Sequence, residues 1–226
     1  MKLKYVSIAL AALVASTAPA QAAITVYTTL AAFNAATMMQ GTDQFNGFSI
    51  TGATVSPIVR STQVGTTYGY TAATPGDFFG AGTTGNPWLS TNTATDTMTF
   101  SVFTGGSNGV GGNFFGSDIA GAFAAGNITL VATDSSGSVT QTIVGATTSS
   151  FLGFVSTTAV TSLTVTSVQP ASGFLWSTVD NLVFAKRAVV QAAVPESSTW
   201  LMMLAGFGLV GGAMRRRSTA RIAQAF

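Results

Sequence analysis

Apolar side chains recur at every second position between Ile24 and Lys186, and this alternation restricts the fold more than any other feature of the sequence. In DTMTFSVF, Met98, Phe100 and Val102 fall on one face, while threonine and serine fall on the other. The same alternation recurs in NITLVATD (127–134) and TSLTVTSV (161–168). Successive side chains of a β-strand point to opposite faces, so a period of two predicts half-buried strands. We therefore expect an all-β domain.

Turn-forming residues separate the alternating segments, as is typical of antiparallel sheets. Ser135, Ser136 and Gly137 lie between two such segments and predict a hairpin turn. We expect further strands at 44–51, 64–70, 151–156 and 174–184. Most of the sixteen phenylalanines and three tryptophans lie in this region and are available to fill the space between two sheets. The sequence thus predicts an antiparallel, jelly-roll-like β-sandwich, which we favour over a barrel.

One short helix is expected at the start of this domain. The segment TTLAAFNAATMM (28–39) offers Thr28 or Thr29 as an N-cap, and the alanines that follow favour a helix. Two longer stretches, 71–95 and 104–127, are rich in glycine, threonine and asparagine. We predict irregular loops there, which either cover an open end of the sandwich or carry function.

Charge is concentrated at the two ends of the chain. Lysines 2 and 4 lie near the N-terminus, and four of the arginines lie beyond residue 214. The middle of the chain holds three basic and six acidic side chains, a formal charge of −3. It lacks a basic patch able to neutralise several phosphates, so we expect no nucleic-acid partner.

Few side chains suited to catalysis are present. The chain has no cysteine and no histidine, and its one glutamate is Glu196. Thiolate chemistry, Ser-His-Asp triads and the preferred ligands of zinc are therefore excluded. Acid–base chemistry would rest on six aspartates in turn-like contexts. We expect no enzyme, no cofactor and no metal, and a hydrolase that uses two aspartates is the least favoured alternative.

Two kinds of binding stay open on the residues alone. Calcium needs only oxygen ligands, and Asp118 and Asp180 are the best candidates, although neither lies in an EF-hand loop. Exposed aromatic rings could instead stack on sugars, yet an aromatic side chain in a sandwich more often lies in the core. The candidates for sugar stacking are Tyr68, Tyr70, Trp88 and Trp176.

The first 22 residues have the features of a secretory signal peptide. Lys2 and Lys4 form a basic start, and the apolar segment Val6–Ala15 follows. As a helix this segment would reach only about 15 Å, half of a bilayer core of about 30 Å. The small residues of APAQAA suit signal peptidase. We predict cleavage after Ala22, with Ala20 as the second choice.

The C-terminal region combines a polar motif, an apolar segment and a cluster of arginines. Residues 200–214 are apolar and would span about 22 Å as a helix. Arg215, Arg216 and Arg217 follow directly, and such a cluster stays on the cytoplasmic side of a membrane. The signal peptide places the domain on the opposite side, so we expect residues 200–214 to cross the inner membrane transiently.

This order of features resembles the PEP-CTERM sorting signal of exported proteins of Gram-negative bacteria. Pro195, Glu196 and Trp200 match the spacing of its PEPxxWA variant, whereas Ser197 stands in place of the second proline and Leu201 in place of alanine. The resemblance covers about 30 of the 226 residues. It implies cleavage near the motif by an exosortase-like membrane protease and delivery to the cell envelope or the extracellular polysaccharide.

These observations divide the chain into four parts: a signal peptide at 1–22, a β-sandwich at 23–185, a linker at 186–193 and a sorting signal at 194–226. We expect an exported, non-catalytic protein with a structural or adhesive role in the envelope or matrix. Its expected partners are signal peptidase, the exosortase-like protease and extracellular polysaccharide. The alternative is a carbohydrate-binding module, with or without a bound calcium ion, which a row of exposed aromatics on one sheet face would favour.

Overall fold

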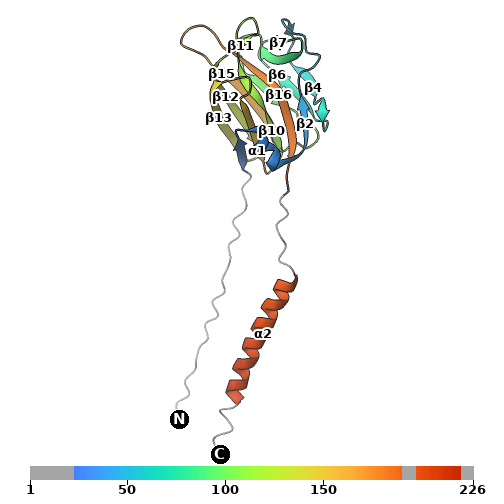
Figure 1. Ribbon diagram of the computed structural model, residues 1–226, viewed down its shortest axis with the longest axis vertical. Helices are drawn as coiled ribbons and strands as arrows, with labels where there is room; N and C mark the ends of the chain where they lie inside the picture. The colour runs from blue at the N-terminus through green and yellow to red at the C-terminus, as the bar shows by residue number, and fades with distance from the viewer. Residues whose placement is uncertain (1–22, 190–196, 220–226) are drawn as a thin grey trace, which may run out of the picture. The chain divides into compact units, whose positions relative to one another are not determined.

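The computed structural model describes residues 23–189 and 197–219, and the side chains of the second range from 201 to 215 (Figure 1). The chain divides after Ala188 into two compact units, which are treated separately. The described part of the first unit is a sandwich of two antiparallel sheets with one short helix. The predicted all-β sandwich is therefore confirmed.

The larger sheet contains ten of the described strands. Its main order is β1 (Ile24–Tyr27), β14 (Phe151–Ser156), β10 (Gly109–Ser117), β16 (Trp176–Arg187), β8 (Asn86–Thr91), β7 (Phe78–Thr83) and β3 (Ala53–Thr54). Three further strands branch from it: β2 (Thr37–Asp43) on β16, β5 (Val64–Gly65) on β2 and β11 (Phe123–Ala124) on β10.

The smaller sheet contains six of the described strands, in the order β13 (Gly137–Ala146), β12 (Gly126–Asp134), β15 (Val160–Val168), β9 (Met98–Ser101), β6 (Gly69–Ala73) and β4 (Ile58–Ser61). The predicted hairpin is present, because Asp134 pairs with Gly137 across the β12–β13 turn. Threonine and serine hydroxyls pair across the strands on the outer face of this sheet, as in Thr129–Thr142 at 2.9 Å.

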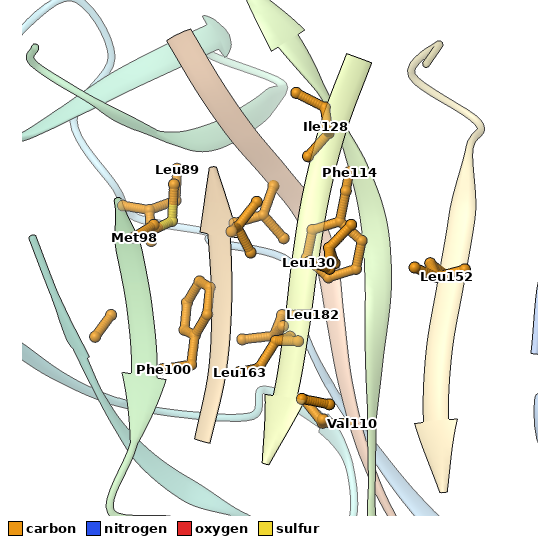
Figure 2. Packing of buried hydrophobic residues seen from close by; sticks show 14 of the residues in the cluster. Leu89, Met98, Phe100, Val110, Phe114, Ile128, Leu130, Leu152, Leu163 and Leu182 are labelled. Carbon is orange, nitrogen blue, oxygen red and sulfur yellow. The ribbon is translucent and has the colours of Figure 1, made fainter. Parts of the chain in front are cut away.

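Alternating side chains from both sheets meet in one core, as the period of two predicts. Figure 2 shows Phe100, Leu130 and Leu163 of the smaller sheet gathered with Phe114 and Leu182 of the larger sheet. All five are fully buried. Val102 was expected on the same face as Phe100, but this expectation is wrong. Strand β9 ends at Ser101, and Val102 adopts a left-handed conformation with 69% of its surface exposed.

The predicted helix is α1 (Leu30–Ala36), and Thr29 is its N-cap. The Thr29 hydroxyl accepts a hydrogen bond from the amide of Ala32 at 3.2 Å, which satisfies one of the free N–H groups of the first turn. Phe33 is buried edge-on against Phe151, with ring centroids 5.6 Å apart. It also packs with Val183, so the helix covers part of the larger sheet.

Three of the four further predicted strands are found, one with its predicted bounds and two with changed bounds. The strand at 151–156 is confirmed as β14, and the one at 174–184 is β16, which runs to Arg187. The stretch 64–70 is divided between β5 and β6. The strand predicted at 44–51 is wrong, because β2 ends at Asp43. The Asp43 carboxylate accepts a hydrogen bond from the amide of Phe45 at 2.7 Å, and this turns the chain.

The two stretches predicted as loops are instead largely strands. Residues 71–95 contain most of β6 and all of β7 and β8, and residues 104–127 contain β10 and β11. Their glycines allow close approach between backbones rather than freedom of the chain. A Cβ atom on Gly80 would collide with the carbonyl oxygen of Ser49, and one on Gly111 would lie 2.8 Å from the Cα of Gly153.

The predicted linker starts two residues too early. Lys186 pairs with Met38 and Arg187 pairs with Thr37 in the larger sheet. The amide of Ala188 then donates to the carbonyl oxygen of Ala36 at 2.9 Å. The sheet therefore continues to Arg187, because its last strand has a partner there.

The second unit contains helix α2 (Ser197–Thr219). Its side chains from Leu201 to Arg215 are exposed. None of the helices in the described ranges is long and apolar enough to cross a membrane. The predicted signal peptide with Ala20 and Ala22, and the motif residues Pro195 and Glu196, lie outside the described residues. The backbones of Trp200, Arg216 and Arg217 belong to α2, but their side chains also lie outside the described part.

Candidate binding face on the larger sheet

The larger sheet has one face in the core and one outer face. Phe114 pairs with Val179, and both are buried in the core. The next pair, Phe115 with Thr178, therefore points to the outer face, because side chains alternate along a strand. The same registers place five aromatic side chains on this outer face: Phe79, Trp88, Phe115, Phe123 and Trp176.

Two adjoining hollows lie at one end of this face, with volumes of about 200 Å³ and 310 Å³. Both are lined by Asn92, Ile119 and Trp176, so the two hollows adjoin at these three residues. We call the two hollows together the Trp176 groove; its remaining lining residues are Phe79, Ser90, Thr91, Thr93, Ala94, Thr95, Asp118 and Phe174.

The Trp176 side chain is held in place and half-buried. Its indole N–H donates to the carbonyl oxygen of Asn92 at 3.2 Å. Phe174 packs edge-on beside it, with ring centroids 6.2 Å apart, and keeps 67% of its surface exposed. Ile119, which also lines both hollows, is 80% exposed. The groove therefore offers a fixed apolar surface to solvent, and such surfaces mark binding sites more often than single exposed residues do.

Polar groups lie beside this apolar surface. One carboxylate oxygen of Asp118 accepts hydrogen bonds from the amides of Ala120 and Ala122, both at 2.9 Å, and so shapes the turn between β10 and β11. Asn92, Thr93 and Thr95 add further polar groups to the lining of the groove.

A cluster of buried hydroxyls supports the floor of the groove. The Thr178 hydroxyl oxygen lies 2.8 Å from that of Ser117 and 3.1 Å from that of Ser90, and the Ser90 and Ser117 oxygens are 3.1 Å apart, so the three hydroxyls form one hydrogen-bonded cluster. These three side chains come from β16, β10 and β8. The hydrogen bonds tie together the three strands that carry the groove, which favours a preformed site.

Of the four aromatic residues predicted to stack on sugars, one lies in the groove. Tyr68 and Tyr70 are fully buried between the sheets, which is the core position favoured for such aromatics and rules out sugar stacking by either ring. Trp88 lies on the outer face, half-buried against Phe115, with ring centroids 4.9 Å apart. Trp176 alone of the four lines the groove. Its neighbour Phe174 was not among the candidates, because it follows a glycine turn in which polar and apolar side chains do not alternate.

The two calcium candidates have separate surroundings. Asp118 holds its own turn, as described above. Asp180 is buried and accepts hydrogen bonds from the amide of Asn181 at 2.7 Å and from the side chain of Asn86 at 3.4 Å. Burial raises the pKa of Asp180, and these two hydrogen bonds only partly counter it. The described residues contain no group of three or more acidic side chains placed to hold a metal ion.

Comparison of the chain with known protein families, with curated proteins and with solved structures finds no match. The function is therefore inferred from the groove and from the sequence of the two chain ends.

Proposed function

We propose that this chain is an exported, non-catalytic protein that binds extracellular polysaccharide through the Trp176 groove. The observation that carries the proposal is the fixed indole ring of Trp176, which lines both hollows, with exposed Phe174 packed beside it. A sugar ring has an apolar C–H face that stacks on an aromatic ring, and hydroxyls that pair with polar side chains at its edge. The groove supplies both kinds of contact.

An uncharged polysaccharide fits the groove best. Its lining includes no lysine and no arginine, and Asp118 is its one charged side chain. A negative charge at the edge of the groove disfavours acidic sugars, because like charges repel in a partly desolvated site. The hydroxyls and the amide of Asn92 can both donate and accept hydrogen bonds, as a neutral sugar requires.

The absence of catalysis in this proposal follows from the composition of the groove. Hydrolysis of a glycosidic bond commonly uses two carboxyl groups on either side of the bond. The groove lining contains Asp118 and no second acid. One oxygen of Asp118 is engaged by two backbone amides, so its role in the fold is to hold a turn.

The two ends of the chain support export and sorting within this proposal. The basic and apolar start of residues 1–22 directs the chain to the secretory pathway, and signal peptidase removes it. The motif at Pro195, Glu196 and Trp200 directs cleavage by an exosortase-like protease. Residues 200–214 contact the inner membrane only until that cleavage. The product then acts as an adhesive or structural component of the envelope or matrix.

Binding of neutral hexasaccharides tests the proposed function. The full chain in a mild detergent is titrated, by calorimetry, with hexasaccharides of glucose, mannose, galactose and N-acetylglucosamine. We expect at least one to bind, and Trp176→Ala to weaken that binding about tenfold or more, which is a loss of about 1.4 kcal/mol. Trp176→Phe should retain most of the affinity, since a ring remains.

A matched control is Val59→Ala on the smaller sheet, where Val59 is 82% exposed. It removes apolar surface elsewhere and should leave binding unchanged. Equal affinity in wild type and Trp176→Ala, or binding of acidic oligosaccharides alone, would show that the groove is not a site for neutral sugars.

A further inference from the structure

A third hollow, of about 360 Å³, lies on the outer face of the larger sheet beside α1. Three carboxamide side chains from separate parts of the chain converge on it: Gln44, Asn113 and Asn181. Phe151, Val183 and Thr42 line it as well. We call this hollow the amide cleft. It is distinct from the Trp176 groove, because the two have no lining residue in common.

An irregularity in the sheet brings two of the carboxamides together. On strand β10, Gly111 pairs with Val183 and Asn113 pairs with Asp180, so the register shifts between them. The extra residue on β16 is accommodated at Asn181, which adopts a left-handed conformation with φ of 49°. Asparagine tolerates this conformation better than most residues. Bulges of this kind often re-aim a side chain beside a binding site.

The apolar surface of the cleft depends on a glycine. Phe151 is paired with Asn113 across the sheet, and a Cβ atom on Gly111 would lie 3.0 Å from the Phe151 ring. The ring therefore lies over Gly111, which leaves room for it. Val183 is 3% exposed and pairs with Thr42 on the neighbouring strand. An aromatic ring and a buried valine thus form one part of the cleft surface.

The carboxamides keep unused hydrogen-bonding capacity. The side-chain N–H₂ of Asn113 donates to the carbonyl oxygen of Thr148 at 3.0 Å, which fixes the side chain and leaves its oxygen to accept. The oxygen of Gln44 accepts from Asn46 at 3.3 Å, which leaves the Gln44 N–H₂ to donate. The Asn181 side chain forms no hydrogen bond within the described residues. The cleft therefore offers donors and acceptors but no charged side chain.

We propose that the amide cleft is a second binding site for an uncharged sugar unit. Carboxamides can both donate to and accept from neighbouring hydroxyls of a sugar, while Phe151 provides the flat apolar contact. The absence of charged side chains from the lining disfavours phosphate, sulfate and uronic acid groups, which need a basic partner.

The two sites lie along one strand of one face. Trp176 and Asn181 both belong to β16 and are five residues apart, about 17 Å at about 3.4 Å per residue. A polysaccharide that follows β16 would contact both sites. This joint engagement rests on the proposed function of the Trp176 groove, whereas the sugar site in the amide cleft does not.

The test uses the full chain in a mild detergent and the same neutral hexasaccharides. Asn181→Gly removes the carboxamide but keeps a residue that tolerates the left-handed conformation. Gln44→Ala removes a second carboxamide. We expect each change to weaken binding about threefold to tenfold, and the double variant more than either. Gln141→Ala, which removes an exposed carboxamide from β13 of the other sheet, is the matched control and should bind as wild type does.

Combination with Trp176→Ala separates the two proposals. Residual binding in Trp176→Ala that disappears in Trp176→Ala/Asn181→Gly/Gln44→Ala supports the amide cleft, even where the Trp176 groove contributes little. Wild-type affinity of Asn181→Gly/Gln44→Ala for every sugar that binds overturns the amide cleft and leaves the Trp176 groove standing. Failure of all the neutral hexasaccharides to bind overturns both. Thermal unfolding of each variant confirms that it is folded, and Asn113→Ser provides a further variant at the cleft.

Discussion

Arg60 forms a bidentate ion pair with Asp43 between the sheets. Nε of Arg60 lies 2.8 Å from Oδ2 of Asp43, and Nη2 lies 2.8 Å from Oδ1. Asp43 is fully buried and accepts two more hydrogen bonds, from the Tyr70 hydroxyl at 2.6 Å and from the Phe45 amide at 2.7 Å. The guanidinium lies 5.3 Å from the centroid of the Phe45 ring. Since β2 belongs to one sheet and β4 and β6 to the other, this pair joins the two layers.

Arg60→Met should destabilise the protein by about 3–5 kcal/mol, because it leaves the Asp43 carboxylate buried without its cation. Burial, together with the charge of Asp43, raises the pKa of Tyr70, so its hydroxyl stays protonated and continues to donate. The hydrogen bonds that Asp43 keeps, from the Tyr70 hydroxyl and the Phe45 amide, cannot replace the lost cation. The free energy of unfolding in urea at neutral pH measures the effect.

The control for this prediction is Arg187→Met, because Arg187 is exposed at the end of β16. This substitution should lower the free energy of unfolding by less than about 0.5 kcal/mol. The double change Asp43→Asn/Arg60→Met should recover part of the stability lost in Arg60→Met, since no charge is then buried. A loss below about 1 kcal/mol in Arg60→Met would show that the ion pair does not hold the sheets together.

The second prediction concerns acid stability and the hairpin turn at Asp134. Its Oδ1 accepts from the amide and the hydroxyl of Ser136 at 2.7 Å and 2.6 Å, and its Oδ2 accepts from the Ser156 hydroxyl at 2.5 Å. Burial alone would raise the pKa of Asp134, but the hydrogen bonds outweigh it and lower the pKa to about 2. The folded pKa is thus below the ordinary value of 3.8.

A depressed folded pKa means that Asp134 stabilises the fold above about pH 4, and that this contribution is lost as the pH falls towards 2. The contribution is about 2 kcal/mol. Asp134→Asn should lower the free energy of unfolding at pH 5, measured in urea. Between pH 5 and pH 2.5 this free energy should fall less in the variant than in wild type. Asp96→Asn is the control, since the Asp96 carboxylate accepts one hydrogen bond, from the amide of Gly76. The free energy of unfolding of this variant should fall between pH 5 and pH 2.5 almost as much as that of wild type. Parallel curves for wild type and Asp134→Asn would contradict this role.

The larger share of the fold could be predicted from the sequence because side-chain alternation reports directly on strands with one buried face. Phe100, Leu130 and Leu163 were placed correctly on this basis. The errors at 71–95 and 104–127 arose where glycine replaces the alternating side chain. Composition cannot distinguish a glycine that frees a loop from one that lets two backbones touch, since the contacting segment is distant in the sequence.

The candidate sites were harder to predict for a related reason. Trp176 and Tyr70 are each followed by a hydroxyl-bearing residue, yet one lines a groove and the other is buried against Phe184, with ring centroids 5.2 Å apart. The difference depends on which elements cover each face of a sheet. The amide cleft depends on a register shift between β10 and β16, which no local pattern encodes.

Gly80 provides the third prediction, because the turn segment 49–52 approaches it closely. The amide of Thr51 donates to the carbonyl oxygen of Gly80 at 2.6 Å, and a Cβ atom on Gly80 would collide with the Ser49 carbonyl oxygen. Gly80→Ala should therefore destabilise the protein by at least about 1–3 kcal/mol, the usual cost of overpacking. Gly85→Ala is the matched control, since nothing lies within 4 Å of a Cβ atom there. Equal melting temperatures for the two variants would show that the 49–52 segment yields without cost.

The last prediction concerns the mature ends of the protein in a Gram-negative host with an exosortase-like system. The full chain carries a formal charge of +2, which depends on two lysines in the predicted signal peptide and four arginines in the predicted sorting signal. Removal of both ends leaves three basic and six acidic side chains, a formal charge of −3. The protein recovered from the cell surface should therefore have an acidic isoelectric point.

Mass spectrometry should place its first residue at Ala23 and its last near Pro195. Replacement of Arg215, Arg216 and Arg217 by serine should let the intact tail persist, because the charged stop is lost. Surface protein that still ends at Phe226 in the wild type would refute removal of the tail.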